Sequence, residues 1–382
     1  MKDYYVILTG GKNNAGDFLI KYRAKKLFAE FRPDREIVDL DAWKPFDRKD
    51  LELVNNAKAL ILMGGPALQS HMYPGIYALT DNLDDIKVPI TTMGVGWKSI
   101  SGNWEDTYDY PLSEPTMGLL EKAASSGLPM SVRDFHTLNV LAFKGINNGL
   151  MTGCPAYYDL EYIGKEMAFP KEIRKVAFSL GVAFIESPSM EREMKAQILE
   201  LKQYFKNSEF EVVFHHSLNP DVFLKSHGAK KKHNQFHNLF AHWLEEEKIP
   251  YVDISGSAES LTNYYSEVDL HIGYRVHAHI YMNSISKMSI LIAEDGRGKA
   301  VEKVIGGLVI NGVNYYCNDL MSKVLKKVFN FYDRYKPNVR CADDVIAQFD
   351  FEVYGNAQRF RASRALVDFN LESMKSYLAK LP

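Results

Sequence analysis

The sequence predicts an α/β protein of two similar domains, whose parallel sheets meet across a cleft, followed by C-terminal helices. Short apolar runs repeatedly end in glycine or a charged residue, and helix-length segments separate them. This is the pattern of strands buried on both faces of a parallel sheet. The rhythm restarts after a stretch with proline and charged residues at 169–175. The chain has 382 residues and 46% hydrophobic content, enough for about two domains.

The first domain is expected over residues 1–168. Its clearest strand-like runs are 4–11, 58–65, 88–96, 129–134 and 149–155. Glycine loops follow most of them. In a doubly wound sheet these loops lie at the carboxyl edge, where such sheets bind ligands.

The second domain is expected over residues 169–315. Strand-like runs lie at 176–181, 210–217, 250–257, 268–274 and 288–295, and segments 190–205 and 234–247 have the apolar spacing of helices. Beyond about residue 315 the strand rhythm stops. Segments 322–335 and 362–380 are expected to be helices, so 316–382 is expected to be a helical segment that packs on the body.

Composition argues against several classes of protein. Lys and Arg total 46 against 48 Asp and Glu, so no global positive field favours nucleic acid. The N-terminus lacks the pattern of a secretory signal, and no apolar run approaches the roughly 20 residues of a membrane span. The three cysteines have no metal-type spacing. We expect a soluble cytoplasmic protein whose oligomeric state the sequence leaves open.

The glycine-rich stretch "GGKNNAGDFLI" at 10–20 does not match either common nucleotide motif. A P-loop requires Lys and Ser or Thr after its last glycine, whereas Gly16 is followed by Asp17 and Phe18. The dinucleotide fingerprint is not met either, although Asp39 and Asp41 lie about where a ribose-binding acid would. Asp17 is therefore either a helix cap or a functional carboxylate at the sheet edge.

The stretch "VDLHIGYRVHAHI" at 268–280 places Arg275, His277 and His279 just after a predicted strand. If a helix begins there, Arg275 and His277 meet a ligand at the sheet edge, and His279 points about 200° away from His277. If the segment is a strand instead, both imidazoles share a face and a metal becomes possible. We expect the helix and no metal. His233 and His237 have zincin-like spacing without the glutamate and are expected at the surface.

Three elements in order resemble the polysaccharide pyruvyl transferase family. They are "GGKNNAGDFLI", "SVRDFHTLNVLAFKGI" followed by "TGCPA", and "DLHIGYRVHAHI" followed by "SILIAEDGRGK". The resemblance spans about residues 8–300. It implies a glycosyltransferase-B-like fold of two Rossmann-like domains. It also implies transfer of a pyruvyl group from phosphoenolpyruvate onto a sugar, with ketal formation and release of phosphate.

The resemblance also implies roles for particular residues. Asp17 matches the acid of the first element, Arg133 the arginine of V-R-D, and Arg275 and His277 the R-x-H pair. The family usually has a lysine after the next strand. This chain has "EDGRGK" there, so Arg297 or Lys299 takes that place.

The chemistry of such a transfer gives an independent reason for these residue types. Phosphoenolpyruvate carries a phosphate and a carboxylate, and arginine binds either anion bidentately. The reaction must protonate the vinyl carbon and remove protons from sugar hydroxyls, which histidine can do near neutral pH. We therefore assign Arg133, Arg275, Arg297 and Lys299 to the donor, and His277 and Asp17 to catalysis. No cofactor is expected beyond the donor substrate.

The acceptor is a sugar of a polysaccharide or of its lipid- or nucleotide-linked precursor. Cleft residues assigned to it are Asn14, Gly65, Trp97 and Trp104, although the aromatic loop at 96–116 can equally anchor itself on the core. The basic run 225–233 is expected to be a solvated loop, or alternatively to attract an anionic lipid-linked sugar at a membrane surface. Two alternatives stay open: a nucleotide-sugar glycosyltransferase of the same fold, and a sugar- or anion-binding module without turnover.

Overall fold

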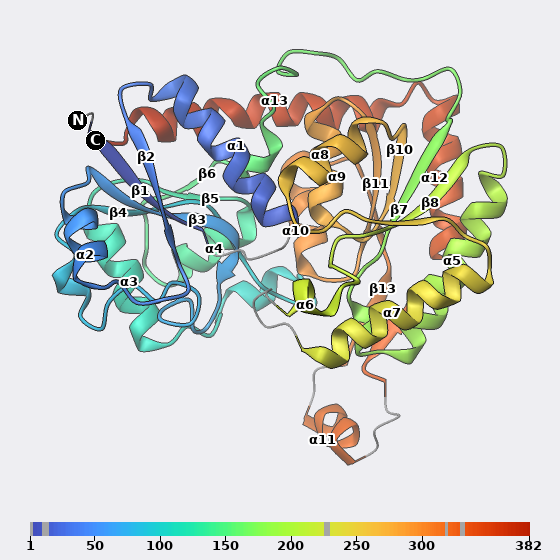
Figure 1. The fold of residues 1–382 in the computed structure, drawn as a ribbon, viewed down its shortest axis with the longest axis horizontal. Coiled ribbons are helices and arrows are strands. Elements are labelled where there is room, and N and C mark those ends of the chain that lie inside the picture. The colour runs from blue at the N-terminus through green and yellow to red at the C-terminus, as the bar shows by residue number, and fades with distance from the viewer. Residues whose placement is uncertain (1–2, 10–14, 225–229, 318–319, 329–332) are drawn as a thin grey trace.

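The computed structural model describes residues 3–9, 15–224, 230–317, 320–328 and 333–382. Two six-stranded parallel sheets, each with helices packed around it, lie side by side, and the long helix α13 (Gln358–Ala379) runs along one edge of both (Figure 1). This is the α/β architecture of two domains that the apolar runs predict.

The first sheet has the strand order β2-β1-β3-β4-β5-β6, and all its pairs are parallel. Its strands are β1 (Tyr4–Thr9), β2 (Glu36–Asp41), β3 (Ala59–Leu68), β4 (Ile90–Trp97), β5 (Met130–Val132) and β6 (Gly149–Met151). Its helices are α1 (Ala15–Phe31), α2 (Arg48–Asn55), α3 (Glu114–Ser125) and α4 (Phe135–Phe143). Most positions of β1, β3 and β4 are buried, which is why these strands appear as continuous apolar runs.

The second sheet has the order β12-β11-β10-β7-β8-β9, again with parallel pairs throughout. Its strands are β7 (Lys175–Ser179), β8 (Glu209–Phe214), β9 (Tyr251–Asp253), β10 (Leu270–Gly273), β11 (Met288–Ala293) and β12 (Leu308–Asn311). Its helices are α5 (Pro188–Tyr204), α6 (Pro220–Phe223), α7 (Lys231–Glu246), α8 (Ala258–Ser266), α9 (Val276–Ser284) and α10 (Gly296–Ile305).

Each sheet has one point where the strand order reverses. In the first sheet this point lies between β1 and β3, and in the second between β7 and β10. At such a point neighbouring loops leave the sheet in opposite directions, which opens a crevice at the carboxyl edge. Asp17 follows β1, and Arg275 follows β10. The topology thus places both residues where doubly wound sheets bind ligands.

The two domains share part of their core. One cluster of buried apolar side chains combines residues of β1 and α1 with residues of α8, α9, α10 and α13. Two further clusters lie on the remaining faces of the second and first sheets. Apolar packing continues from one domain into the other. The relative position of the two domains is therefore held by a buried interface as well as by the chain that links them.

The C-terminal part departs from the predicted pair of helices. Strand β13 (Val313–Tyr316) pairs antiparallel with β14 (Tyr335–Pro337), so strands continue beyond residue 315. Between them lies α11 (Leu320–Val328), which ends before residue 335 and projects from the body in Figure 1. Helix α12 (Cys341–Tyr354) was not predicted, whereas α13 matches the predicted segment. The prediction failed at β14 because three residues carry too little pattern for a strand.

Candidate active site

The turn from β10 into α9 carries Arg275 and His277. Gly273 has φ +139°, and a Cβ there would come within 2.4 Å of the Ser179 carbonyl oxygen. Because glycine has no Cβ, β7 can approach closely, and the backbone N–H of Arg275 donates to Ser179 Oγ at 3.0 Å. Arg275 is the residue before α9, and His277 lies in its first turn. The predicted helix start is confirmed.

His277 reaches across to the first domain. A Cβ on Gly16, in the first turn of α1, would lie 2.1 Å from His277 Nδ1, so the imidazole rests directly against the α1 backbone. Within the described part of the chain, His277 Nε2 is buried without a hydrogen-bond partner. The imidazole therefore sits at the contact between the two reversal points.

The imidazole is surrounded by positive charge. Burial, followed by the charges of Arg133, Arg297 and Arg275 in that order, lowers the pKa of His277 to about 3. In the free protein the ring is therefore neutral near pH 7. Three of the four cations assigned to the donor therefore lower the pKa of one imidazole.

Arg133 comes from the first domain, directly after β5. It is 6% exposed, and its backbone N–H donates to the Val95 carbonyl at 2.9 Å. A Cβ on Gly96 would lie 1.9 Å from Arg133 Nε, so this glycine lets the guanidinium lie along the end of β4. Asp134 lies 3.4 Å from the same Nε and caps α4 by accepting from the Thr137 N–H.

Arg297 and Lys299 have different surroundings. Arg297 Nη2 donates to Asp295 Oδ2 at 2.7 Å, and this pair raises the pKa of Arg297. Lys299 Nζ instead donates to the Ser101 carbonyl of the first domain at 2.7 Å. Arg297 acts on His277, whereas Lys299 links the two domains. This geometry favours Arg297 as the donor-site cation.

Asp17 lies inside the first turn of α1, so it is not the residue that precedes the helix. A Cβ on Gly65 would be 3.6 Å from Asp17 Oδ1, which places these two predicted residues together at the reversal point between β1 and β3. Asp17 also contributes to the raised pKa of Arg297 in the other domain. Asn14, the other residue predicted from this loop, lies outside the described residues.

The predicted aromatic acceptor residues do not line the cleft as a pair. Trp97 is fully buried and stacks on His136 at a ring distance of 5.0 Å, so its assignment to the cleft was wrong. Trp104 stacks on the same His136 ring at a ring distance of 4.2 Å, and it is 38% exposed. The indole of Trp97 faces inward because it ends β4, whose side chains are all buried.

Several residues near the site were not assigned from the sequence. His216 Nε2 lies 3.3 Å from Arg275 Nη1, whereas its neighbour His215 is buried against the Tyr265 hydroxyl. Glu294 follows β11 and accepts from the Val182 and Ala183 N–H groups, and burial raises its pKa. The signal in the sequence that could have identified Glu294 is its position at the carboxyl end of a predicted strand.

His237 corrects another expectation, because it is 1% exposed and packs among Phe184, Phe214 and Phe223. Within the described ranges, no group of three or more His, Cys, Asp or Glu residues could hold a metal ion. No described helix is both long and apolar enough to cross a membrane.

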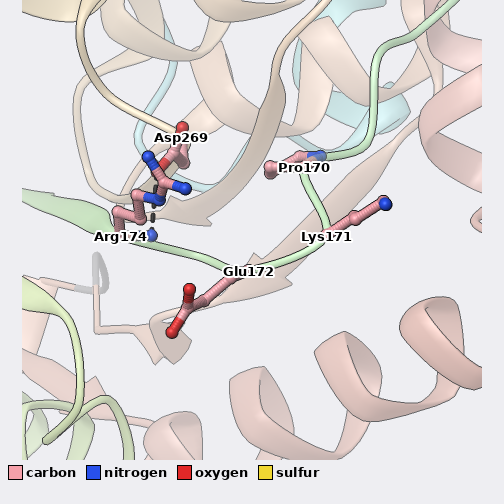
Figure 2. Close-up of a pocket in the computed structure, with 5 residues that line it drawn as sticks. All are labelled: Pro170, Lys171, Glu172, Arg174 and Asp269. Carbon is pink, nitrogen blue, oxygen red and sulfur yellow. Dashed lines mark hydrogen bonds between the residues drawn. The ribbon is translucent and has the colours of Figure 1, made fainter.

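A small cavity of about 130 Å³ adjoins the site between the domains. It is lined by the loop at Ile100, Ser101 and Asn103, by residues after β11 including Lys299, and by β13. The larger cavity, about 480 Å³, lies elsewhere (Figure 2). Its lining residues Arg174 and Asp269 directly precede β7 and β10, so it lies at the amino edge of the second sheet. We therefore do not assign it to the site around His277.

Comparison with known proteins agrees with this architecture. Residues 14–281 match the sequence profile of the family described as polysaccharide pyruvyl transferase. The apo structure of OtsA has a TM-score of 0.52 and 9% identity, with 99% of each chain covered. An α,α-trehalose-phosphate synthase (UDP-forming) from Burkholderia vietnamiensis has a TM-score of 0.49 and 10% identity, with 100% of this chain and 99% of that chain covered. No curated protein matches the sequence.

The similarity to OtsA shows the fold, which is the glycosyltransferase-B-like pairing of two Rossmann-like domains. Fold and site together define a two-domain α/β protein of this fold with a cationic centre between its sheets. The family profile covers well over half of the chain, and the protein belongs to the polysaccharide pyruvyl transferase family.

Proposed function

We propose that the protein transfers the pyruvyl group of phosphoenolpyruvate onto two hydroxyls of one sugar, forming a ketal and releasing phosphate. The observation that carries this proposal is that Arg133, Arg275 and Arg297 all lower the pKa of His277, whose imidazole rests against the α1 backbone at Gly16. Three guanidinium groups match a donor that carries both a phosphate and a carboxylate. The proposal needs no cofactor, because the donor supplies the leaving group.

The reaction begins with a proton on the vinyl methylene of the donor, which makes C2 electrophilic. His277 is the group we assign to this step. The bound donor brings negative charge next to the imidazole, which favours the imidazolium and raises its pKa from the low value in the free protein. His277 is then protonated, and able to donate a proton, only when the donor is bound.

Two sugar hydroxyls must then add to C2. The first forms a C–O bond as its proton leaves, phosphate departs with the electrons of its C–O bond, and the second hydroxyl closes the ketal and loses its proton. Asp17 belongs to the first domain and lies beside Gly65 at the reversal point. We assign it to orienting or deprotonating an acceptor hydroxyl.

The acceptor is proposed to enter beside the cavity between the domains. That cavity carries a mixed lining of amide, hydroxyl and tyrosine side chains, among them Asn103, Ser101 and Tyr315. Such groups suit a sugar, which presents hydroxyls and apolar ring faces.

Phosphate release from phosphoenolpyruvate, measured across a panel of nucleotide- and lipid-linked sugars, tests the proposal. We expect phosphate only when a suitable sugar is present, together with a ketal methyl signal in the product. Release of nucleoside diphosphate from a nucleotide sugar without phosphoenolpyruvate would instead assign glycosyl transfer. A protein that binds the donor but releases nothing with any acceptor would be a binding module.

A further inference from the structure

Helix α11 has an apolar face and a basic remainder. Apolar residues stand at positions 321, 324, 325 and 328, which fall on one side of a helix with 3.6 residues per turn. The same nine residues contain three lysines and no acid. A helix with this composition in a folded protein normally packs its apolar face on the body.

Three residues of the apolar face of α11 are instead exposed. Met321 is 67% exposed, Val324 48% and Val328 65%. Figure 1 shows α11 beyond the edge of the body, past α6 and α7. Clustered exposed apolar residues on one helix face mark an interaction surface, whereas scattered ones do not.

The β13–β14 hairpin, from which α11 extends in the chain, is anchored. Cys317 N–H donates to the Arg334 carbonyl at 2.8 Å where β13 and β14 meet, and Arg334 Cζ lies 4.5 Å from the centre of the Tyr316 ring. Asp333 accepts from the Ser189 N–H at 2.9 Å and from Ser187 Oγ at 2.7 Å, at the start of α5. The β13–β14 hairpin, which flanks α11 in the chain, is therefore fixed to the second domain.

We propose that α11 docks on an anionic membrane surface. An amphipathic helix with lysines lies in the interface of a bilayer with its apolar side inserted, and anionic headgroups attract its lysines. A second copy of the chain is a poorer occupant, because two copies of a helix with three lysines and no acid repel each other.

This docking also narrows the acceptor class, a step that rests on the proposed function. The strand β13 that leads into α11 lines the cavity between the domains through Asn314, Tyr315 and Tyr316. Three residues, 317–319, separate β13 from α11, so a membrane that holds α11 lies within a short length of chain of the strand that lines the cavity. The acceptor that fits this arrangement is a saccharide on a lipid carrier.

Sedimentation with vesicles tests the inference on the full chain. We expect binding to phosphatidylcholine vesicles that contain phosphatidylglycerol, little binding to phosphatidylcholine alone, and weaker binding as salt rises. The triple variant Met321→Ser, Val324→Ser, Val328→Ser should bind on the order of tenfold more weakly or worse. Lys323→Glu should weaken binding roughly fivefold or more, because each lysine near the surface contributes about that factor.

A matched triple variant provides the control. Val353, Tyr354 and Phe369 are 53%, 87% and 73% exposed on α12 and α13, away from α11 in Figure 1. Changing these three to serine should leave vesicle binding unchanged. Unchanged binding by the α11 triple variant, or absence of binding by the unaltered protein, would overturn the inference. Lipid-free self-association that the α11 triple variant abolishes would assign the face to a second copy and overturn it too.

Donor binding separates this inference from the proposed function. The α11 triple variant should bind phosphoenolpyruvate as the unaltered protein does, because α11 lies outside the arginine cluster. If vesicles bind but phosphoenolpyruvate does not, the docking stands and the proposed function fails. If phosphoenolpyruvate binds and vesicles do not, the proposed function stands and the docking fails.

Discussion

At the scale of single residues, the site is a buried, neutral imidazole whose pKa is lowered by three guanidinium groups. Burial and the charges of Arg133, Arg297 and Arg275 keep the pKa of His277 at about 3 in the free protein. Such a ring cannot donate a proton near pH 7 by itself. Any acid role for His277 therefore depends on negative charge that a ligand brings.

This dependence predicts proton uptake on donor binding. The anionic donor raises the pKa of His277, so between about 3 and the new value the imidazole gains a proton when the donor binds. Calorimetric titration with phosphoenolpyruvate at pH 7 to 8, in buffers of different ionisation enthalpy, measures this uptake. We expect a substantial fraction of one proton in the unaltered protein and its loss in His277→Gln. Equal proton counts in both would show that His277 does not titrate with the donor.

The arginines should determine donor affinity. We expect Arg133→Ala and Arg275→Ala each to weaken binding of phosphoenolpyruvate by roughly 1.5 to 3 kcal/mol, because an anion loses a charge-assisted partner. Titration of the folded variants measures the loss. Arg192→Ala is the control, because the Arg192 side chain is 74% exposed on α5. Unchanged affinity in both site variants would remove them from the donor site.

At the scale of elements, the starts of α1 and α9 touch through Gly16 and His277. A Cβ on Gly16 would lie 2.1 Å from His277 Nδ1, so Gly16→Ala must displace the imidazole or separate the two helices. We expect kcat to fall by about 10²-fold, since small displacements of a catalytic group have effects of this size. The change should not destabilise α1 itself, because alanine is more favourable than glycine in a helix by about 1 kcal/mol.

Gly118→Ala in α3 is the matched control for this change. A Cβ there meets nothing within 4 Å, so activity should stay unchanged. Steady-state kinetics and thermal melting of both variants give the comparison. A Gly16→Ala protein with the original kcat would mean that the contact between α1 and α9 does not set the position of His277.

The two histidines after β10 differ in their surroundings: His277 belongs to the site, whereas His279 is part of the buried core. His279 is fully buried, and its Nδ1 lies 2.8 Å from Ser289 Oγ. Burial lowers the pKa of His279 to about 3, below its value of 6.5 in an unfolded chain. The unfolded state thus binds more protons between these values, so stability is complete above pH 6.5 and is lost as the pH falls towards 3.

His279→Gln should make stability less dependent on pH. One such histidine contributes up to about 1.4 kcal/mol per pH unit to the slope below 6.5. Urea unfolding at pH 7 and at pH 5.5 measures the slope, and donor turnover should change little. An unchanged slope in His279→Gln would show that this ring titrates equally in both states.

Sequence patterns predicted the parts of the site that follow regular elements. Arg275 and His277 were found because an apolar run ends at Gly273 and the 3.6-residue period then separates His277 from His279. Trp97 was misplaced because the sequence does not say which way the last residue of a buried strand points. His237 was misplaced although it shares a helix face with Phe240, Ala241 and Leu244, a spacing that indicates burial.

At the scale of the whole molecule, α13 and the cleft loops hold the two domains together. Asn370 Nδ2 donates to the Val304 carbonyl of α10 at 3.1 Å, and beyond the helix the Tyr5 hydroxyl donates to the Pro382 carbonyl at 2.6 Å. Across the cleft, Gly296 N–H donates to the Ser99 carbonyl at 3.0 Å. The sequence could not predict these contacts, because they join positions far apart in the chain. They bring Arg133 and His277 from different domains into one site.

The central claim is that this interdomain site transfers a proton to the donor through His277. The most direct test is the kcat of His277→Gln with phosphoenolpyruvate and a saturating sugar acceptor, measured beside its donor dissociation constant. We predict that kcat falls by about 10²- to 10⁴-fold while donor affinity changes little, because glutamine keeps the size of the side chain and loses the titrating group. A variant that keeps most of its kcat, or loses only donor affinity, would contradict the claim.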